Sequence, residues 1–232
     1  MNARPRLWVI DPSCKVAEDQ GVRRVLDGAH PDSRVFEPAL SGDGPRPGDL
    51  PDATVDGIVV LGSGVSVYED HAWLSELSEW LLPWVAGEHA TPLLGICFGH
   101  QLIAHLAGGS VGFLRTDRSK DVGYRETTVA VGARLAPPGR YRVLASHREV
   151  VTDLSVGWRT VASREDVTCD GFEHDTRDVH AVQFHPEAST EFLERAGLDA
   201  GLFDDEAERT ARAVLGTFRD RCAARASRKI TP

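Results

Sequence analysis

The sequence predicts an α/β fold with an open, mostly parallel central sheet, helices on both faces and a small antiparallel extension. Two observations lead to this prediction. Up to Gly109, short apolar runs alternate with helix-like segments, which is typical of a parallel sheet. After Gly109, short β-branched runs are separated by Gly, Pro and Asp, which is typical of antiparallel strands. The length of 232 residues fits one domain, expected over residues 1–225, with residues 226–232 as a flexible tail.

The individual elements follow from apolar runs and their periodicity. Strands are predicted at residues 7–10, 34–37, 57–61, 93–96, 124–131, 141–145, 159–162, 167–172 and 179–184, and helices at 16–26, 73–86, 100–107 and 204–224. Pro83 is expected to kink or end its helix, because proline lacks the backbone N–H that a helix interior needs. Residues 38–52 are rich in Pro, Gly and Asp and predict an irregular surface loop.

Composition and charge narrow the possible classes of function. The 26 Lys and Arg against 35 Asp and Glu give a formal charge of −9, which argues against nucleic-acid binding. No apolar stretch has the length of a membrane span, and the N-terminal apolar run is too short for a signal peptide. The four cysteines have no Cys-x-x-Cys spacing, so we expect no zinc site and no disulfide framework. The sequence has no recognisable phosphate-binding loop, and we expect no metal and no cofactor. A cytoplasmic protein with free thiols is the expectation.

The most informative motif is Gly95-Ile96-Cys97-Phe98-Gly99, where an apolar run ends and a helix-like segment begins. Two glycines permit a sharp turn from strand to helix that exposes the central side chain, as in a nucleophile elbow. The N-terminus of the following helix favours the thiolate form of Cys97. The alternative is a buried, unreactive cysteine at a junction between a strand and a helix.

A second motif, His185-Pro186-Glu187, follows the last predicted strand. Residues two apart on a strand share a face, so the Glu187 carboxylate could orient the His185 imidazole while its other nitrogen faces Cys97. Both motifs would lie at the carboxyl ends of parallel strands, where such folds assemble ligand sites. The alternative is a turn with two solvated side chains, which the pairing with the Cys97 motif makes less attractive.

A third segment, Gly62-Ser63-Gly64, ends another predicted strand of the parallel core. A backbone N–H from this loop and the N–H of Phe98 are candidate donors to an oxyanion that develops beside Cys97. The alternative is a plain turn at the end of a strand.

Taken together, the Cys97 motif and Val182-Gln183-Phe184-His185-Pro186-Glu187 resemble the class I (triad) glutamine amidotransferase family. The segment Leu61-Gly62-Ser63-Gly64-Val65-Ser66-Val67-Tyr68 most resembles the stand-alone, GMP-synthase-like members of that family. The resemblance implies a flavodoxin-like fold and hydrolysis of the side-chain amide of glutamine. It implies that Cys97 forms a thioester, that His185 acts first as base and then as acid, and that Glu187 orients His185.

The same resemblance suggests further site residues and two departures. It implies that Gln101 helps to hold the amino-acid end of glutamine. It also implies that Ser146 and His147 lie in a segment whose backbone contacts the substrate. The alternative for His147 is a partly exposed polar residue without a catalytic role. In the family the oxyanion loop usually reads Gly-Gly-Pro or Asn-Gly-Pro, so Ser63 stands at the donor glycine and Gly64 at the stiffening proline. A more mobile loop and a lower basal glutaminase activity are expected.

The second departure concerns the partner. The chain lacks the Ser-Gly-Gly-x-Asp-Ser signature of an ATP-pyrophosphatase, so a synthetase that receives the ammonia would be another polypeptide. Two alternatives stay open. One is a γ-glutamyl hydrolase that acts on γ-glutamyl amines or peptides without a partner, and the other is a catalytically silent binding module.

Overall fold

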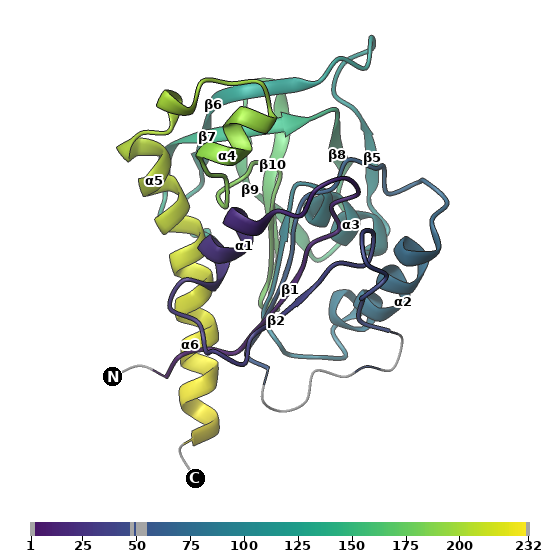
Figure 1. Cartoon of the computed structure of the whole chain (residues 1–232), viewed down its shortest axis with the longest axis vertical. Coiled ribbons are helices and arrows are strands. Elements are labelled where there is room, and N and C mark those ends of the chain that lie inside the picture. The colour runs from purple at the N-terminus through teal and green to yellow at the C-terminus, as the bar shows by residue number, and fades with distance from the viewer. Residues whose placement is uncertain (1–2, 47–48, 50–54, 231–232) are drawn as a thin grey trace.

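The structure is a computed structural model that describes residues 3–46, 49 and 55–230 (Figure 1). Strands of the main sheet are β1 (Leu7–Ile10), β2 (Arg34–Phe36), β3 (Gly57–Val60), β4 (Leu93–Ile96), β6 (Asp121–Val129), β7 (Gly139–His147), β9 (Trp158–Arg164), β10 (Val167–His174) and β11 (Val179–Val182). Within the described residues they form one sheet in the order β2-β1-β3-β4-β11-β10-β9-β6-β7.

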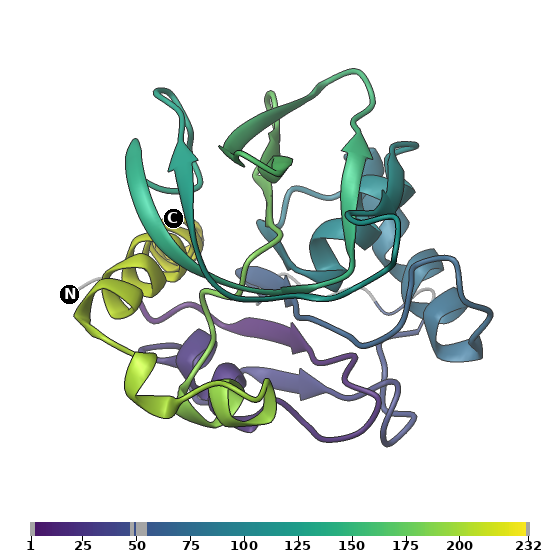
Figure 2. The same cartoon turned by 90° about the horizontal axis from the view of Figure 1, so that it is seen from above.

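The sheet changes character at β11. Neighbouring strands from β2 to β11 are parallel, whereas every pair from β11 through β10, β9 and β6 to β7 is antiparallel. In Figure 2 the antiparallel strands, in teal and green, extend to one side of the purple and blue parallel strands. The predicted parallel core with an antiparallel extension is therefore confirmed. A separate pair, β5 (Ser110–Phe113) with β8 (Glu149–Asp153), was not expected from the sequence.

Helices cover both faces of the parallel strands (Figure 1). They are α1 (Asp19–Leu26), α2 (Ala72–Ala86), α3 (Phe98–Leu106), α4 (Thr190–Arg195), α5 (Asp205–Ala211) and α6 (Thr217–Ile230). Alternation along β1 sends Trp8 and Ile10 into the core with α2 and α3, and Val9 into the core with α1 and α6. The buried sheet is thus apolar on both faces, as a parallel sheet requires.

The helix predicted at residues 73–86 is α2, which continues through Pro83 to Ala86 and ends at Gly87, whose φ is 90°. Of the two outcomes expected at Pro83, a kink or a helix end, the helix end is therefore wrong. Trp80 and Trp84, on either side of the proline, are 2% and 1% exposed, and their burial holds the helix together across the missing hydrogen bond.

The C-terminal helix also differs from the expectation. Residues 204–224 were expected to form one helix, but a π-helical turn at Arg212–Gly216 separates α5 from α6. Helix α6 reaches Ile230, so residues 226–230 of the expected flexible tail are helical, and Lys229 Nζ donates to Asp56 Oδ1 at 2.7 Å. Residues 231–232 of that tail, and residues 47–48 and 50–52 of the expected surface loop, lie outside the described residues. None of the described helices has the length and hydropathy needed to cross a bilayer.

The fold brings four strand ends to one edge of the sheet. Strand β1 leads to Asp11, β3 to Gly62, β4 to Cys97 and β11 to Gln183, and the five strands from β2 to β11 run in the same direction. This edge is where an open α/β sheet places its ligands.

Candidate active site

Cys97 lies at the tip of the turn between β4 and α3. Its φ of 52° and ψ of −98° are unusual for a residue with a side chain, and its N–H donates to Val182 O at 2.8 Å. The flanking glycines are required by space, since a Cβ at Gly99 would lie 2.2 Å from Val60 O and one at Gly95 would lie 2.5 Å from Gly99 O. The turn therefore has the geometry of a nucleophile elbow.

His185 and Glu187 form a buried pair just after β11. Nδ1 of His185 lies 2.8 Å from Oε1 of Glu187, and the two residues are 6% and 1% exposed. Burial alone lowers the pKa of His185, but the charges on Glu187 and Cys97 outweigh it and raise that pKa to about 10. The imidazole is thus held as an imidazolium, which is the partner a thiolate needs.

Gly62, which follows β3, lies where the ends of β3, β4 and β11 come together. A Cβ placed on Gly62 would lie 3.1 Å from Cε1 of His185 and 3.6 Å from Cβ of Cys97. The backbone after β3 therefore borders both the sulfur-bearing residue and the imidazole. The sequence-predicted residues Cys97, His185, Glu187 and Gly62 are brought together.

Gln183 belongs to the same cluster, although the sequence analysis did not single it out. Its Nε2 donates to Sγ of Cys97 at 3.6 Å, and its Oε1 accepts from Nε2 of Gln101 at 3.2 Å. Gln101 also donates to Glu149 O at 2.7 Å, which fixes its amide. A signal was present in the sequence: Gln183 is a polar residue in an apolar run, two positions before His185 and hence on the same side of the strand.

The loop at residues 62–64 is held by side-chain hydrogen bonding rather than by the close backbone packing seen at Cys97. Oγ of Ser63 donates to Pro12 O at 2.7 Å and lies 3.5 Å from Sγ of the exposed Cys14. A Cβ on Gly64 would meet nothing within 4 Å, so this glycine faces open space. Phe98, the other predicted oxyanion donor, begins α3, and N–H groups in a first helical turn have no acceptor within the helix.

Ser146 and His147 end β7, but His147 belongs to a buried charged cluster. Its Nε2 lies 2.8 Å from Nη2 of Arg164, and Nη1 of Arg164 donates to Asp121 at 2.9 Å. Burial and then the nearby Arg164 lower the pKa of His147 to about 3. His147 is therefore neutral near pH 7, and its Nε2 can accept the hydrogen bond from Nη2 of Arg164.

A cleft of about 620 Å³ opens over the cysteine. Its lining residues come from the loop after β3, the α3 start, the segment before β6 and the β7–β8 turn: Ser63, Gly64, Val65, Ser66, Glu69, Cys97, Gln101, Phe113, Lys120, Ser146, His147, Arg148 and Glu149. Most of the predicted substrate-binding residues thus share one cleft with Cys97.

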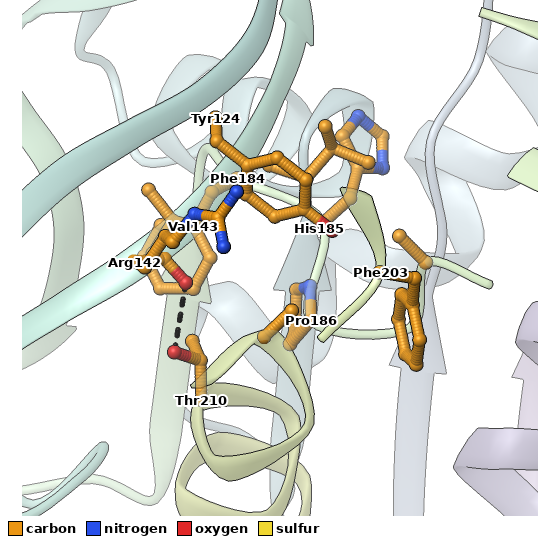
Figure 3. A pocket seen from close by; sticks show the side chains of 11 residues that line it. Tyr124, Arg142, Val143, Phe184, His185, Pro186, Phe203 and Thr210 are labelled. Carbon is orange, nitrogen blue, oxygen red and sulfur yellow. Dashed lines mark hydrogen bonds between the residues drawn. The ribbon is translucent and has the colours of Figure 1, made fainter. Parts of the chain in front are cut away.

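A second, much smaller pocket lies behind His185, between β7, α5 and the segment after β11 (Figure 3). Oγ1 of Thr210 donates to Arg142 O there at 2.8 Å, and the imidazole of His185 points away from this cavity (Figure 3). Cys97 lines the first cleft and not this second one, so a substrate of the cysteine would bind in the first cleft.

Comparison with known proteins points to one family. Residues 46–203 match the family model described as glutamine amidotransferase class-I. The chain is 33% identical over 187 residues to the GMP synthase [glutamine-hydrolyzing] of Albidiferax ferrireducens, covering 72% of this chain and 34% of that protein. It is 33% identical over 169 residues to the protein of the same name from Ralstonia pickettii, covering 66% of this chain and 30% of that one. The chain thus spans about a third of the length of these curated relatives.

A solved structure extends the agreement to the whole fold. The glutamine amidotransferase of Thermotoga maritima superposes with a TM-score of 0.70 at 21% identity, covering 97% of this chain and 99% of that one. The chain belongs to the class-I glutamine amidotransferase family, and it is an enzyme of that class.

Proposed function

We propose that the protein hydrolyses the side-chain amide of glutamine to glutamate and ammonia, with Cys97 as nucleophile, His185 as acid and base, and Glu187 as the residue that orients His185. The observation that carries the proposal is the buried His185–Glu187 pair, 2.8 Å apart, beside a cysteine in a strained elbow at the base of an open cleft.

The chemistry follows from the charges of these groups. In the resting pair the proton sits on His185, and the thiolate of Cys97 attacks the amide carbon of glutamine. The N–H groups of Ser63 and Phe98 are the proposed donors to the oxyanion. His185 then gives its proton to the departing ammonia, leaving a γ-glutamyl thioester, and takes a proton from the water that hydrolyses it.

Substrate binding is proposed for the residues that line the cleft above the sulfur. Gln101, Ser146 and His147 border it, as does the loop at residues 62–64. Gln101 is already held by Glu149 O and Gln183, so its amide is pre-organised toward a bound substrate.

A partner is proposed for the ammonia. The curated relatives are named GMP synthases and are about three times longer than their matched part, so most of each relative lies outside the match. We infer that a synthetase partner receives the ammonia from this chain.

The direct test is to incubate the protein with glutamine and to measure glutamate and ammonia, with Cys97→Ser as the matched variant. The wild type should release both products in equal amounts, and Cys97→Ser should lower the rate at least about 10³-fold. Equal release by the two proteins would remove Cys97 from the mechanism.

The openness of the cleft favours one second candidate. Phe113 and Lys120 are exposed and extend the lining beyond the cysteine, which leaves room for a substrate larger than glutamine. A γ-glutamyl hydrolase acting on γ-glutamyl amines or peptides would use the same thioester. Turnover of a γ-glutamyl amine at least ten times faster than glutamine, without any partner, would support this second candidate.

A further inference from the structure

Glu18, which the mechanism above does not use, lies beside the carboxyl of Glu187. Glu18 immediately precedes α1, is 9% exposed, and approaches Gly21 on the first turn of that helix. A Cβ on Gly21 would lie 2.8 Å from Cγ of Glu18 and 3.0 Å from Cγ of Glu187. The missing side chain of Gly21 is therefore what lets the two acidic side chains meet.

Each of the two carboxyls has one oxygen with a partner and one without. Oε1 of Glu187 faces His185, and Oε2 of Glu18 accepts from Arg195. The remaining oxygens, Oε2 of Glu187 and Oε1 of Glu18, are buried and have no hydrogen-bond partner in the described part of the chain. A Cβ placed on Gly21 would lie 3.2 Å from Oε1 of Glu18, so this unpartnered oxygen is on the side of Glu18 that faces Gly21 and Glu187.

Two buried acceptors at one place are costly unless a proton lies between them. An unsatisfied buried polar atom costs about 1–3 kcal/mol, and two neighbouring carboxylates repel each other. One shared proton removes both penalties, as it does in other close carboxyl pairs.

We propose that Glu18 is a positioning residue of the triad: its protonated carboxyl donates from Oε1 to Oε2 of Glu187 and holds Glu187 against His185. The inference rests on the proposed function, because it assigns Glu18 a place behind the acid and base of that reaction. Glu18 would act only through Glu187 and would not touch the substrate.

The groups around Glu18 are consistent with a retained proton. They are Asp11 at the end of β1, His185 and Glu187 after β11, and Arg195 on α4. Burial, and after it the charge on Glu187, raises the pKa of Glu18 from 4.5 to about 7, against the opposing effects of Arg195 and His185. The carboxylate of Asp11 is occupied by the N–H of Glu18, at 2.6 Å, which fixes the backbone of Glu18.

A pH dependence follows with a definite sign. Below the raised pKa, Glu18 keeps its proton and the hydrogen bond to Glu187. Above it, the donor is lost and a second negative charge appears beside Glu187. We therefore expect an alkaline decline in kcat near pH 7 that belongs to Glu18, well below the pH at which His185 loses its own proton.

The test compares Glu18→Gln, Glu18→Ala and the control Asp19→Asn, which removes an exposed carboxyl one residue away. Gln keeps a donor at every pH, so Glu18→Gln should retain wild-type activity near pH 6 and lose the decline near pH 7. Glu18→Ala should lower kcat about 10- to 100-fold with little change in KM, because Glu187 loses its support. Asp19→Asn should match the wild type.

A second readout needs no substrate and separates this proposal from the proposed function. Alkylation of Cys97 by iodoacetamide, followed on the Cys97 peptide by mass spectrometry, reports the thiolate directly. Glu18→Ala should slow alkylation near pH 6 about ten-fold, and Glu18→Gln should not. This alkylation pattern without any glutamine turnover would leave the positioning role in place and would overturn the proposed function instead.

The pH dependence of stability gives a third readout. Between pH 4.5 and about 7, Glu18 ionises in the unfolded state but keeps its proton in the folded state, so the free energy of unfolding of the wild type falls as the pH rises. The urea midpoint of Glu18→Gln should rise relative to the wild type between pH 4.5 and about 7 and then stay level. The proposal is overturned if Glu18→Gln and Glu18→Ala share one alkylation profile, or if Glu18→Gln keeps the decline near pH 7.

Discussion

The turn at Cys97 and the loop at residues 62–64 follow neighbouring parallel strands and border the same cleft, but they are held in different ways. The turn is fixed by packing, since glycines at 95 and 99 leave no space for a Cβ against Gly99 O and Val60 O. The loop is held by the side chain of Ser63, which donates to Pro12 O and lies 3.5 Å from Sγ of Cys14, and Gly64 lies in open space. The nucleophile is therefore placed by close backbone packing, and the proposed oxyanion donor is placed by side-chain hydrogen bonding.

The turn and the loop therefore differ in how well they tolerate substitution. Close backbone packing transmits strain, so a substitution at the elbow affects both stability and activity. A hydrogen bond contributes about 1 kcal/mol, so a substitution in the loop mainly affects the orientation of the proposed oxyanion donor. Three variants test this difference.

The largest effect is expected for Gly99→Ala. The new Cβ would lie 2.2 Å from Val60 O, so either β3 or α3 must shift. We expect a loss of about 3 kcal/mol in the free energy of unfolding and no measurable glutaminase activity. Urea unfolding and product release measure both. Gly216→Ala is the matched control, because a Cβ at Gly216 would also meet nothing within 4 Å and Gly216 does not line the cleft. A Gly99→Ala protein of wild-type stability and activity would contradict the packing account of the elbow.

An intermediate effect is expected for Gln183→Met, which keeps the size of the side chain but removes both the donor to Sγ of Cys97 and the acceptor of Nε2 of Gln101. A hydrogen bond to a charged group contributes about 1.5–3 kcal/mol, so kcat/KM should fall about 10- to 100-fold. The urea midpoint should change little, which separates the donor from its packing. Unchanged kcat/KM would mean that the 3.6 Å contact does not help the sulfur.

The smallest effect is expected for Ser63→Ala in the loop. Removing the bond to Pro12 O should cost about 1 kcal/mol of transition-state stabilisation, or about five-fold in kcat/KM. The matched control is Ser41→Ala, because Oγ of Ser41 makes the same kind of bond to Glu37 O on an exposed surface. If both variants keep full activity, the loop is positioned by something other than the Ser63 side chain.

The sequence predicts those parts of the site that depend on local geometry. The elbow is such a part, because two glycines around Cys97 at the end of an apolar run fix the turn. His185 and Glu187 are another, because they are only two residues apart. The predicted strand at residues 179–184 ends at Val182, so a turn after β11, and not a shared strand face, brings the imidazole and the carboxylate together. The order of the parallel strands then brings both motifs to one edge.

The remaining parts depend on contacts between distant elements. Glu18 meets Glu187 only because Gly21 on α1 packs beside the segment after β11, and His147 meets Arg164 only because the antiparallel strands place them together. The continuation of α2 through Pro83 has the same origin, since burial of Trp80 and Trp84 outweighs the local preference of proline. Such tertiary contacts have no signature within a short window of sequence.

The proposed mechanism requires that the sulfur of Cys97 forms a covalent bond to the acyl group of glutamine. Rapid acid quenching of the protein during turnover, followed by mass spectrometry of the Cys97 peptide, detects this bond. We expect a γ-glutamyl adduct on Cys97 that appears with glutamine, disappears when glutamine is exhausted and is absent from Cys97→Ser. Steady turnover of glutamine with no adduct on Cys97 at any quench time, or with an adduct on Cys14 instead, would contradict it.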